Sequence, residues 1–275
     1  MRKAITLVVS LMMMATLAAP VRSLVAARNT IGAEFEAKTY TAADYVQDGL
    51  IAMWDGIENA GWGVHDESMR CLVDLCGNPD YDMYLNHSSV ILGDSYVLIP
   101  TNYSVSSIFP ISTKTTQSLS TETKTVECFV TSFTGRGSLS VTCLYELGVN
   151  NRVDFYYGAA YAIRTGTSSS SRACFQAMPY GTENGSYTFS YQDDISVCTA
   201  IYHNGRRIDN TNNRVIPSPG YGGGAMKIGS WNWKGAANAI PKGVKIHSLR
   251  VYGRVLSDAE VLHNYRIDKS RFNLP

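Results

Sequence analysis

An alternating segment near the C-terminus, followed directly by the signals of a helix start, constrains the fold of this chain most strongly. In residues 245–252 apolar and polar side chains alternate, and β-branched and aromatic residues are frequent. This pattern is typical of a half-buried β-strand, in which successive side chains point to opposite faces. One face is predicted to carry Ile246, Ser248, Arg250 and Tyr252, and the other His247, Leu249 and Val251.

The period of the pattern changes at Gly253, and a short helix is predicted to begin a few residues later. Ser257 is a suitable N-cap residue, and Glu260 stands three positions on, as a capping box requires. Leu256 and Val261 occupy the two positions of a hydrophobic staple. The segment therefore predicts a strand, a tight turn and a helix.

Short strand signals recur along most of the chain, separated by clusters of Gly, Asn, Ser or Pro. Such regular spacing indicates an all-β sandwich or barrel. Asn204-Gly205 predicts a type I′ hairpin turn, because both residues accept a positive φ; a ligand contact through Asn204 is the alternative. Residues 102–123 are rich in Ser and Thr and predict a long loop or an irregular edge. The expected strands are 50–54, 81–85, 89–92, 95–99, 125–133, 139–145, 153–157, 159–164, 172–178, 186–191 and 197–202.

Several of these segments together resemble the concanavalin A-like lectin/glucanase superfamily, in its laminin-G-like bacterial branch. The similar segments are the opening strand 49–56, residues 71–78, the hairpin 200–207, residues 226–230 and the terminal strand and helix 245–262. Cys71 is a departure, because the family often has Trp there. The resemblance implies an antiparallel jelly-roll β-sandwich with a short C-terminal helix over residues 45–275. It implies no particular reaction, because function depends on sites grafted onto a fold.

The N-terminus has the three-part design of a secretory signal peptide. A basic start precedes the apolar residues 4–19, and small residues follow, so cleavage is expected after Ser23 or after Ala27. The apolar run is shorter than the ~20 residues that span a bilayer, although an uncleaved anchor is the alternative. We expect residues 1–27 to be a leader and 28–44 a linker. The protein is then secreted or at the cell surface, with no membrane span after cleavage.

Charge and cysteine content narrow the possible partners. The formal net charge is +1 and no basic stripe is present, so a nucleic-acid partner is not expected.

An even number of cysteines in an exported chain allows disulfides, with Cys71–Cys76 and Cys128–Cys143 as possible pairs; buried free thiols are the alternative. No CxxC or paired-His motif indicates a metal site. The six cysteines are Cys71, Cys76, Cys128, Cys143, Cys174 and Cys198.

The sequence contains no recognisable catalytic motif. Glucanases of the resembled superfamily carry Glu-x-Asp-x-Glu on a strand, because period-two spacing holds acid and nucleophile ~5–5.5 Å apart. This triplet is absent, as are a nucleophile elbow, a zinc-protease motif and a phosphate loop. We therefore expect no enzyme activity; glycan cleavage by a site assembled only in space is the less favoured alternative. The acids considered are Glu122, Glu127, Glu146, Asp154, Asp193 and Asp194.

Aromatic residues supply a candidate glycan site, because sugar rings have apolar faces that stack on flat side chains. Trp231 and Trp233 share one face if the chain there is extended. A second candidate is the Gly-rich loop 56–66. Packing beneath a loop is the alternative for each Trp, and Trp54, within a strand, is expected in the core. The candidate ligand-binding residues are Tyr221, Trp231, Asn232, Trp233, Trp62 and His65.

Calcium is common in relatives of the resembled family, but it needs several converging oxygen ligands and no motif supplies them. No cofactor is predicted. We expect an exported recognition or adhesion module that binds a glycan or a cell-surface protein. The alternative is a structural or protein-interaction domain, for example virion-associated, without a sugar site. The residues whose side-chain oxygen atoms are chemically suitable calcium ligands are Asp94, Asp193, Asp194 and Asn232.

Overall fold

The computed structural model describes the sandwich and its helix but not the expected leader. Residues 1–27 and the first part of the expected linker, to residue 38, lie outside the described residues. A compact unit runs from Tyr40 to Pro275. The described residues are 39–101, 110–114, 119, 123–132, 141–149, 151–157, 161–166, 174–178, 184–191, 198–208, 222–228 and 243–273.

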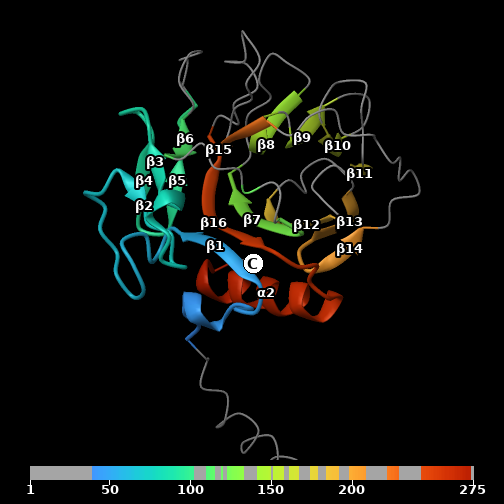
Figure 1. Cartoon of the computed structure of the whole chain (residues 1–275), viewed down its shortest axis with the longest axis horizontal. Coiled ribbons are helices and arrows are strands. Elements are labelled where there is room, and N and C mark those ends of the chain that lie inside the picture. Colours follow the sequence, from blue (N-terminus) through green and yellow to red (C-terminus); the bar gives the residue numbers. More distant parts are fainter. Residues whose placement is uncertain are drawn as a thin grey trace, which may run out of the picture. The chain divides into compact units, whose positions relative to one another are not determined.

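One eight-stranded antiparallel sheet packs against the C-terminal helix, and we call it the helix-side sheet (Figure 1). Its central strand β16 (Lys245–Tyr252) pairs with β7 on one side and with both β5 and β1 on the other. In spatial order, the remaining strands are β14 (Arg206–Ile208), β13 (Cys198–His203), β12 (Gly185–Tyr191), β7 (Thr125–Thr131), β5 (Tyr96–Leu98) and β4 (Ile91–Gly93), with β1 (Leu50–Asp55) beside β16.

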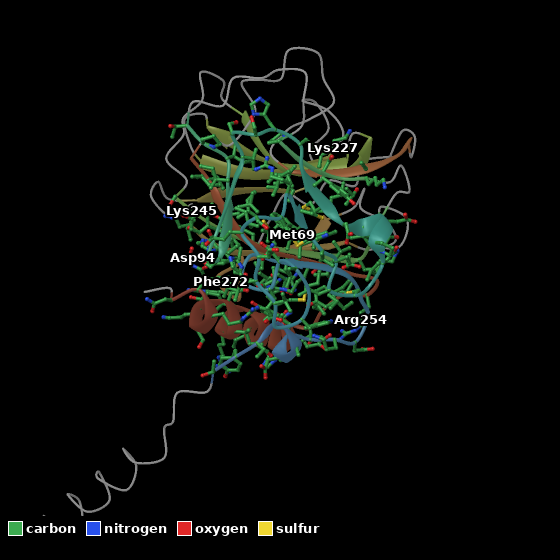
Figure 2. All side chains as sticks on the ribbon, turned by 90° about the vertical axis from the view of Figure 1, so that its left-hand side faces the viewer. Met69, Asp94, Lys227, Lys245, Arg254 and Phe272 are labelled. Carbon is green, nitrogen blue, oxygen red and sulfur yellow. The ribbon has the colours of Figure 1, made fainter. Side chains whose placement is uncertain are left out.

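The second sheet also has eight antiparallel strands and lies opposite the first (Figure 1). Its strands, in spatial order, are β11 (Cys174–Met178), β10 (Tyr161–Gly166), β9 (Asn151–Tyr157), β8 (Val141–Val149), β15 (Gly222–Ile228), β6 (Ile111–Thr113), β3 (Met83–Leu85) and β2 (Cys71–Leu72). Figure 2 shows Lys227 of β15 on this sheet, whereas Phe272 lies with the helix beyond the other sheet.

Both sheets contribute to one apolar core. Trp54 and Leu249 of the helix-side sheet are about 1% exposed and belong to the same buried cluster as Met83, Ile111 and Ile228 of the second sheet. Apolar faces removed from water in this way are the main stabilising contribution of a sandwich. The predicted all-β antiparallel sandwich with a short C-terminal helix is confirmed, and so is the core position of Trp54.

Helix α2 (Asp258–Arg271) starts where the sequence predicts. The Ser257 hydroxyl accepts a hydrogen bond from the Glu260 amide, and the Glu260 carboxylate accepts one from the Ser257 amide at 2.8 Å. Leu256 and Val261 are buried in one cluster with Tyr252. The capping box and the apolar pair therefore fix the angle at which α2 returns over its sheet. No helix of the described residues is long and apolar enough to cross a membrane.

The hairpin turn between β13 and β14 is confirmed, with φ of 52° at Asn204 and 71° at Gly205. The Asn204 side-chain oxygen accepts from the Ser186 amide at 3.0 Å, so it holds the turn. Residues Ala42–Asp44 form a 3₁₀ helix, η1, in which the Asp44 carboxylate accepts from the Thr41 amide. A second 3₁₀ helix, η2, covers Pro79–Tyr81.

The expectation of a long loop or an irregular edge over residues 102–123 needs correction. Ile111–Thr113 form β6, which lies inside the second sheet between β15 and β3. Ile111 pairs with Leu85 and with Ile228. Pairing with these residues, which are distant in the sequence, makes this segment a strand, and local composition does not indicate it. Strand β2 was not predicted for the same reason.

The side chains of β16 also depart from the predicted alternation between two faces. A β-bulge at His247 sets Ile246 opposite Val130 and Ser248 opposite Phe129. Ile246 is therefore in the core with Leu249, not on the face of Ser248 and Arg250. One extra residue in a strand reverses the direction of the side chains before it.

The cysteine pairs considered from the sequence are not formed. Cys71, Cys76 and Cys128 carry free thiols. Cys128 is in β7 and Cys143 is in β8, so the two strands belong to different sheets rather than to one hairpin.

Candidate functional site

Trp62 lies at the tip of the loop that joins β1 to β2, residues 56–70, which we call the Trp62 loop. The tip is closed by a bridge between Gly61 and Val64. Trp62 is 46% exposed and Val64 51% exposed, so the tip presents two apolar side chains to solvent. Gly61 and Gly63 have φ of 132° and 71°, which L residues rarely adopt. The two glycines thus allow the sharp turn that exposes the indole.

The carboxylate of Glu58 holds this tip in place. One oxygen, Oε2, accepts from the Gly63 amide at 2.9 Å. The other, Oε1, accepts from the Ala42 amide at 2.7 Å and from Arg271 Nη2 at 2.8 Å. Glu58 is only 6% exposed, and charge-assisted hydrogen bonds in such a place are strong. A single side chain therefore ties the tip to η1 and to the end of α2.

The base of the loop is closed by Asn59, which is fully buried. Its side-chain amide donates to the Asp66 carbonyl at 3.0 Å and its side-chain oxygen accepts from the Asp66 amide at 2.9 Å. Its own carbonyl accepts from the Val73 amide at 2.8 Å. A loop with these internal bonds is ordered before any ligand arrives, which lowers the entropic cost of binding.

His65 follows the tip and has one ring nitrogen available. Its Nδ1 lies 3.0 Å from the Ile57 carbonyl oxygen. Since a carbonyl only accepts, Nδ1 carries the hydrogen, and Nε2 is then an acceptor in the neutral ring. Nε2 lies 3.9 Å from Glu67 Oε1, and the Glu67 side chain is 57% exposed. The loop therefore carries an exposed carboxylate, which only accepts hydrogen bonds, five residues after the indole.

The Trp62 loop carries more acidic than basic residues. Residues 56–69 contain Glu58, Asp66 and Glu67 and no Lys or Arg, and Arg70 is the last residue of the loop. Hydrogen bonds from the Ser68 hydroxyl and amide lower the pKa of Asp66, so this carboxylate is ionised at neutral pH.

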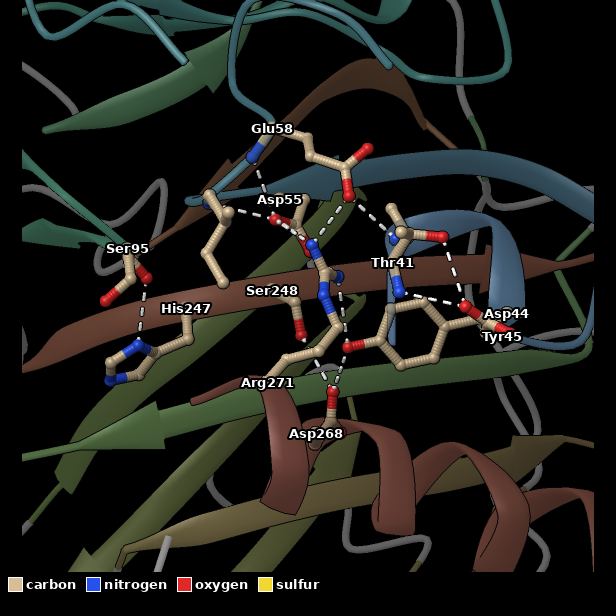
Figure 3. A network of polar contacts seen from close by, with 12 residues as sticks. Thr41, Asp44, Tyr45, Asp55, Glu58, Ser95, His247, Ser248, Asp268 and Arg271 are labelled. Atoms are coloured by element: carbon tan, nitrogen blue, oxygen red, sulfur yellow. Dashed lines mark hydrogen bonds and ion pairs between the residues drawn. The ribbon is translucent and has the colours of Figure 1, made fainter. Parts of the chain in front are cut away.

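A buried polar network lies between the helix-side sheet and α2, behind the loop (Figure 3). Arg271 contacts Asp55 at 2.6 and 3.1 Å as well as Glu58. The Tyr45 hydroxyl donates to Asp268 at 2.7 Å. Burial raises the pKa of Asp55, and Arg271 opposes this shift. The network joins both chain ends of the compact unit to the start of the Trp62 loop.

Arg250 is the second arginine of the network and is fully buried. It contacts Glu127 at 2.9 Å and binds both oxygens of Asp268 at 2.9 Å. Burial raises the pKa of Glu127, with Arg250 acting in the opposite direction. The carboxylates of Glu127 and Asp268 therefore hold Arg250 beneath α2, away from solvent.

The structure brings two of the predicted site residues together, Trp62 and His65 on one loop. Asp94 is exposed on the turn between β4 and β5. Within the described part of the chain, no three His, Cys, Asp or Glu side chains are grouped to hold a metal ion. Sequence reasoning missed Glu58, whose partners are distant in the chain. The candidates Tyr221, Trp231, Asn232, Trp233, Asp193 and Asp194 lie outside the described residues.

No protein-family model and no curated protein sequence matches this chain. Solved structures match its fold. A mutant of Trypanosoma rangeli sialidase displaying trans-sialidase activity aligns with a TM-score of 0.55 and 11% identity, over 82% of this chain and 34% of that one. Trypanosoma rangeli sialidase itself gives 0.52 and 9%, over 90% and 38%. Domain 4 of AbnA, a GH43 extracellular arabinanase from Geobacillus stearothermophilus, gives 0.49 and 16%, over 78% and 96%.

The chain spans about a third of the length of the sialidase that it matches. At 11% identity this likeness shows a shared β-sandwich fold.

Proposed function

We propose that this protein is a non-catalytic recognition or adhesion module that binds glycans, built on a concanavalin A-like, laminin-G-like sandwich. The observation that carries the proposal is the indole of Trp62, exposed at the tip of a loop that Glu58 holds in place. An exposed tryptophan on a fixed backbone is a stacking surface for the apolar face of a sugar ring. His65 and Glu67 add polar atoms for hydroxyl groups beside it.

A glycan context is compatible with the fold. Trypanosoma rangeli sialidase in complex with sialic acid shares this sandwich with a TM-score of 0.53 at 11% identity. Most glycoside hydrolases place two carboxyl groups on either side of the scissile bond, although sialidases use a tyrosine nucleophile. In the described part of the chain, the pairs Asp55–Glu58 and Glu127–Asp268 are buried and occupied by arginines. This favours binding over cleavage for these four acids.

The proposal includes the residues that the sequence indicates beyond the described ones. Trp231 and Trp233, with Tyr221 and Asn232, are proposed as a second stacking surface. Export through the leader 1–27 would place both surfaces outside the cell, where glycans and surface proteins are encountered.

The second candidate is a protein-interaction surface without a sugar site. It is favoured by Ile91 on the edge strand β4, which is 48% exposed. An exposed apolar residue on a sheet edge is a potential contact for another chain.

A glycan array probed with the protein tests the two candidates. The comparison is between the parent, Trp62→Ala and Ile91→Ala, since Trp62 and Ile91 are almost equally exposed. We expect Trp62→Ala to reduce the signal at least tenfold and Ile91→Ala to leave it unchanged. Trp231→Ala and Trp233→Ala report separately on the second surface. Equal glycan binding by the parent and all three Trp variants would refute the proposed site.

A further inference from the structure

We infer that the Trp62 loop selects uncharged sugar units and discriminates against sialylated, uronate-containing or sulfated glycans. This inference depends on the proposed glycan function of the same loop and specifies its ligand class. It concerns the atoms around the indole, which are hydrogen-bond acceptors and negative charges rather than donors and positive charges.

The first support is the hydrogen-bonding chemistry of the loop. The carboxylate of Glu67 only accepts, and the Nδ1 hydrogen of His65 is already donated to the Ile57 carbonyl. Hydroxyl groups of a neutral sugar can donate to the Glu67 carboxylate. A sugar carboxylate or sulfate is an acceptor and finds no donor in either of these two groups.

The second support is the charge of the loop. Asp66 and Glu67 are exposed acids, and hydrogen bonds from Ser68 lower the pKa of Asp66. Segment 56–69 has no Lys or Arg, and Arg70, the last residue of the loop, donates its guanidinium hydrogens to the carbonyls of Val90, Leu85 and His87. At about 6 Å in water, one like charge weakens binding of an anion roughly threefold.

Residues 56–69 contain no Lys or Arg that would offset this repulsion. Glu58 lies directly behind residue 63, and its cationic partner Arg271 is 2% exposed in its side chain. Arg271 therefore neutralises the buried carboxylate but is not available to a ligand. The apolar pair Trp62 and Val64 projects from an acidic surface, which suits a neutral polyol with one apolar face.

The test uses pairs of immobilised glycans that differ only in a terminal sialic acid or a sulfate. We expect binding that depends on Trp62 to be three- to tenfold weaker for the anionic member of each pair. The difference should fall below about twofold in 1 M salt, where the screening length is ~3 Å. Glu67→Lys should reduce or reverse the discrimination, and Glu67→Gln should have an intermediate effect.

The outcomes separate this inference from the function on which it depends. Trp62-dependent binding that prefers the anionic member overturns the inference and leaves the glycan function intact. Discrimination that is insensitive to salt and to Glu67→Lys also overturns the inference. Binding of the parent to phosphatidylcholine vesicles and to no glycan, lost in Trp62→Ala, would overturn both proposals. Thermal unfolding of each variant confirms that it is folded.

Discussion

Glu58 and Arg271 form an ion pair of 2.8 Å although 213 residues separate them. Arg271 is in the last turn of α2 and also contacts Asp55 at the end of β1. The C-terminal helix thus holds both the start of the Trp62 loop and the residue that fixes its tip. The function proposed for the tip depends on a helix that contributes no contact to the ligand.

Replacing Glu58 should loosen the tip without removing the indole. In Glu58→Ala, the amides of Gly63 and Ala42 lose their acceptor and Arg271 loses one of its two carboxylates. We expect the free energy of unfolding to fall by roughly 2–4 kcal/mol, because buried polar groups are left unpaired. Faster amide exchange at residues 61–64 and weaker glycan binding should accompany this loss.

The control for this variant is Glu67→Ala, since the Glu67 side chain is 57% exposed. We expect its stability to lie within about 0.5 kcal/mol of the parent. Unchanged exchange at residues 61–64 in Glu58→Ala would show that Glu58 does not position the tip.

Gly56 should tolerate no side chain. A Cβ built there would lie 2.5 Å from the backbone carbonyl of Ser95 and 2.6 Å from the Tyr96 amide nitrogen. Since backbone atoms cannot rotate away, Gly56→Ala should force the β4–β5 hairpin to shift. We expect a loss of roughly 2–4 kcal/mol in urea unfolding.

Gly77→Ala is the matched variant for Gly56→Ala. Gly77 has φ of 85° and open space where a Cβ would be, so only backbone strain opposes the change. A loss of about 1 kcal/mol is expected. Equal losses at the two glycines would mean that the close approach of Gly56 to Ser95 is not tight.

His247 should make stability depend on pH. Burial lowers the pKa of this ring to about 4, and Lys245 acts in the same direction. Its neutral form bonds the Ser95 carbonyl at 2.9 Å and the Thr131 hydroxyl at 2.7 Å. Because the folded pKa is below the unfolded value, this contribution is fully present above pH ~6.5 and is lost as the pH falls towards 4.

The shift corresponds to roughly 3 kcal/mol over this range. The measurement is urea unfolding of the parent and of His247→Gln between pH 4 and 7. We expect a smaller decrease on acidification in the variant than in the parent. His263→Gln, a change at an exposed position on α2, serves as the control. A variant that follows the parent curve at every pH would exclude His247 as the titrating group.

Local patterns in the sequence predicted much of the sandwich, because each depends on neighbouring residues. Ser257 and Glu260 are three positions apart, and Asn204-Gly205 requires only its own backbone angles, so both features could be read directly. The bulge at His247 could not be predicted from the sequence in this way. It reflects how β16 meets β7 and β5, and it reversed the predicted face of Ile246.

The candidate site was only partly predictable for a related reason. Trp62 was identified because glycines flank it, and this is a local signal. The support of the loop was missed, because Glu58 bonds to Ala42 and Arg271 at separations of 16 and 213 residues. Polar pairs between residues that are far apart in the chain produce no periodic pattern in the sequence. Only the fold brings such residues together.

The pair of Arg250 with Glu127 and Asp268 gives a final prediction. Arg250 is fully buried and is the cation between these carboxylates. In Arg250→Met, two buried acids remain without the cation that lies between them. We expect a loss of 3–5 kcal/mol at pH 7, the range for breaking a buried pair by removing one partner.

The pH dependence identifies the cause of this loss. Burial raises the pKa of Glu127 and Arg250 opposes this shift, so without the arginine its folded pKa should lie further above the unfolded value. Such groups favour folding when they are protonated and oppose it as the pH rises, so the deficit relative to the parent should shrink between pH 7 and pH 5. The further changes Glu127→Gln and Asp268→Asn should recover part of the stability at pH 7. A deficit of equal size at both pH values would mean that lost packing on the Tyr45 ring, 3.9 Å from the guanidinium, outweighs the unpaired charges.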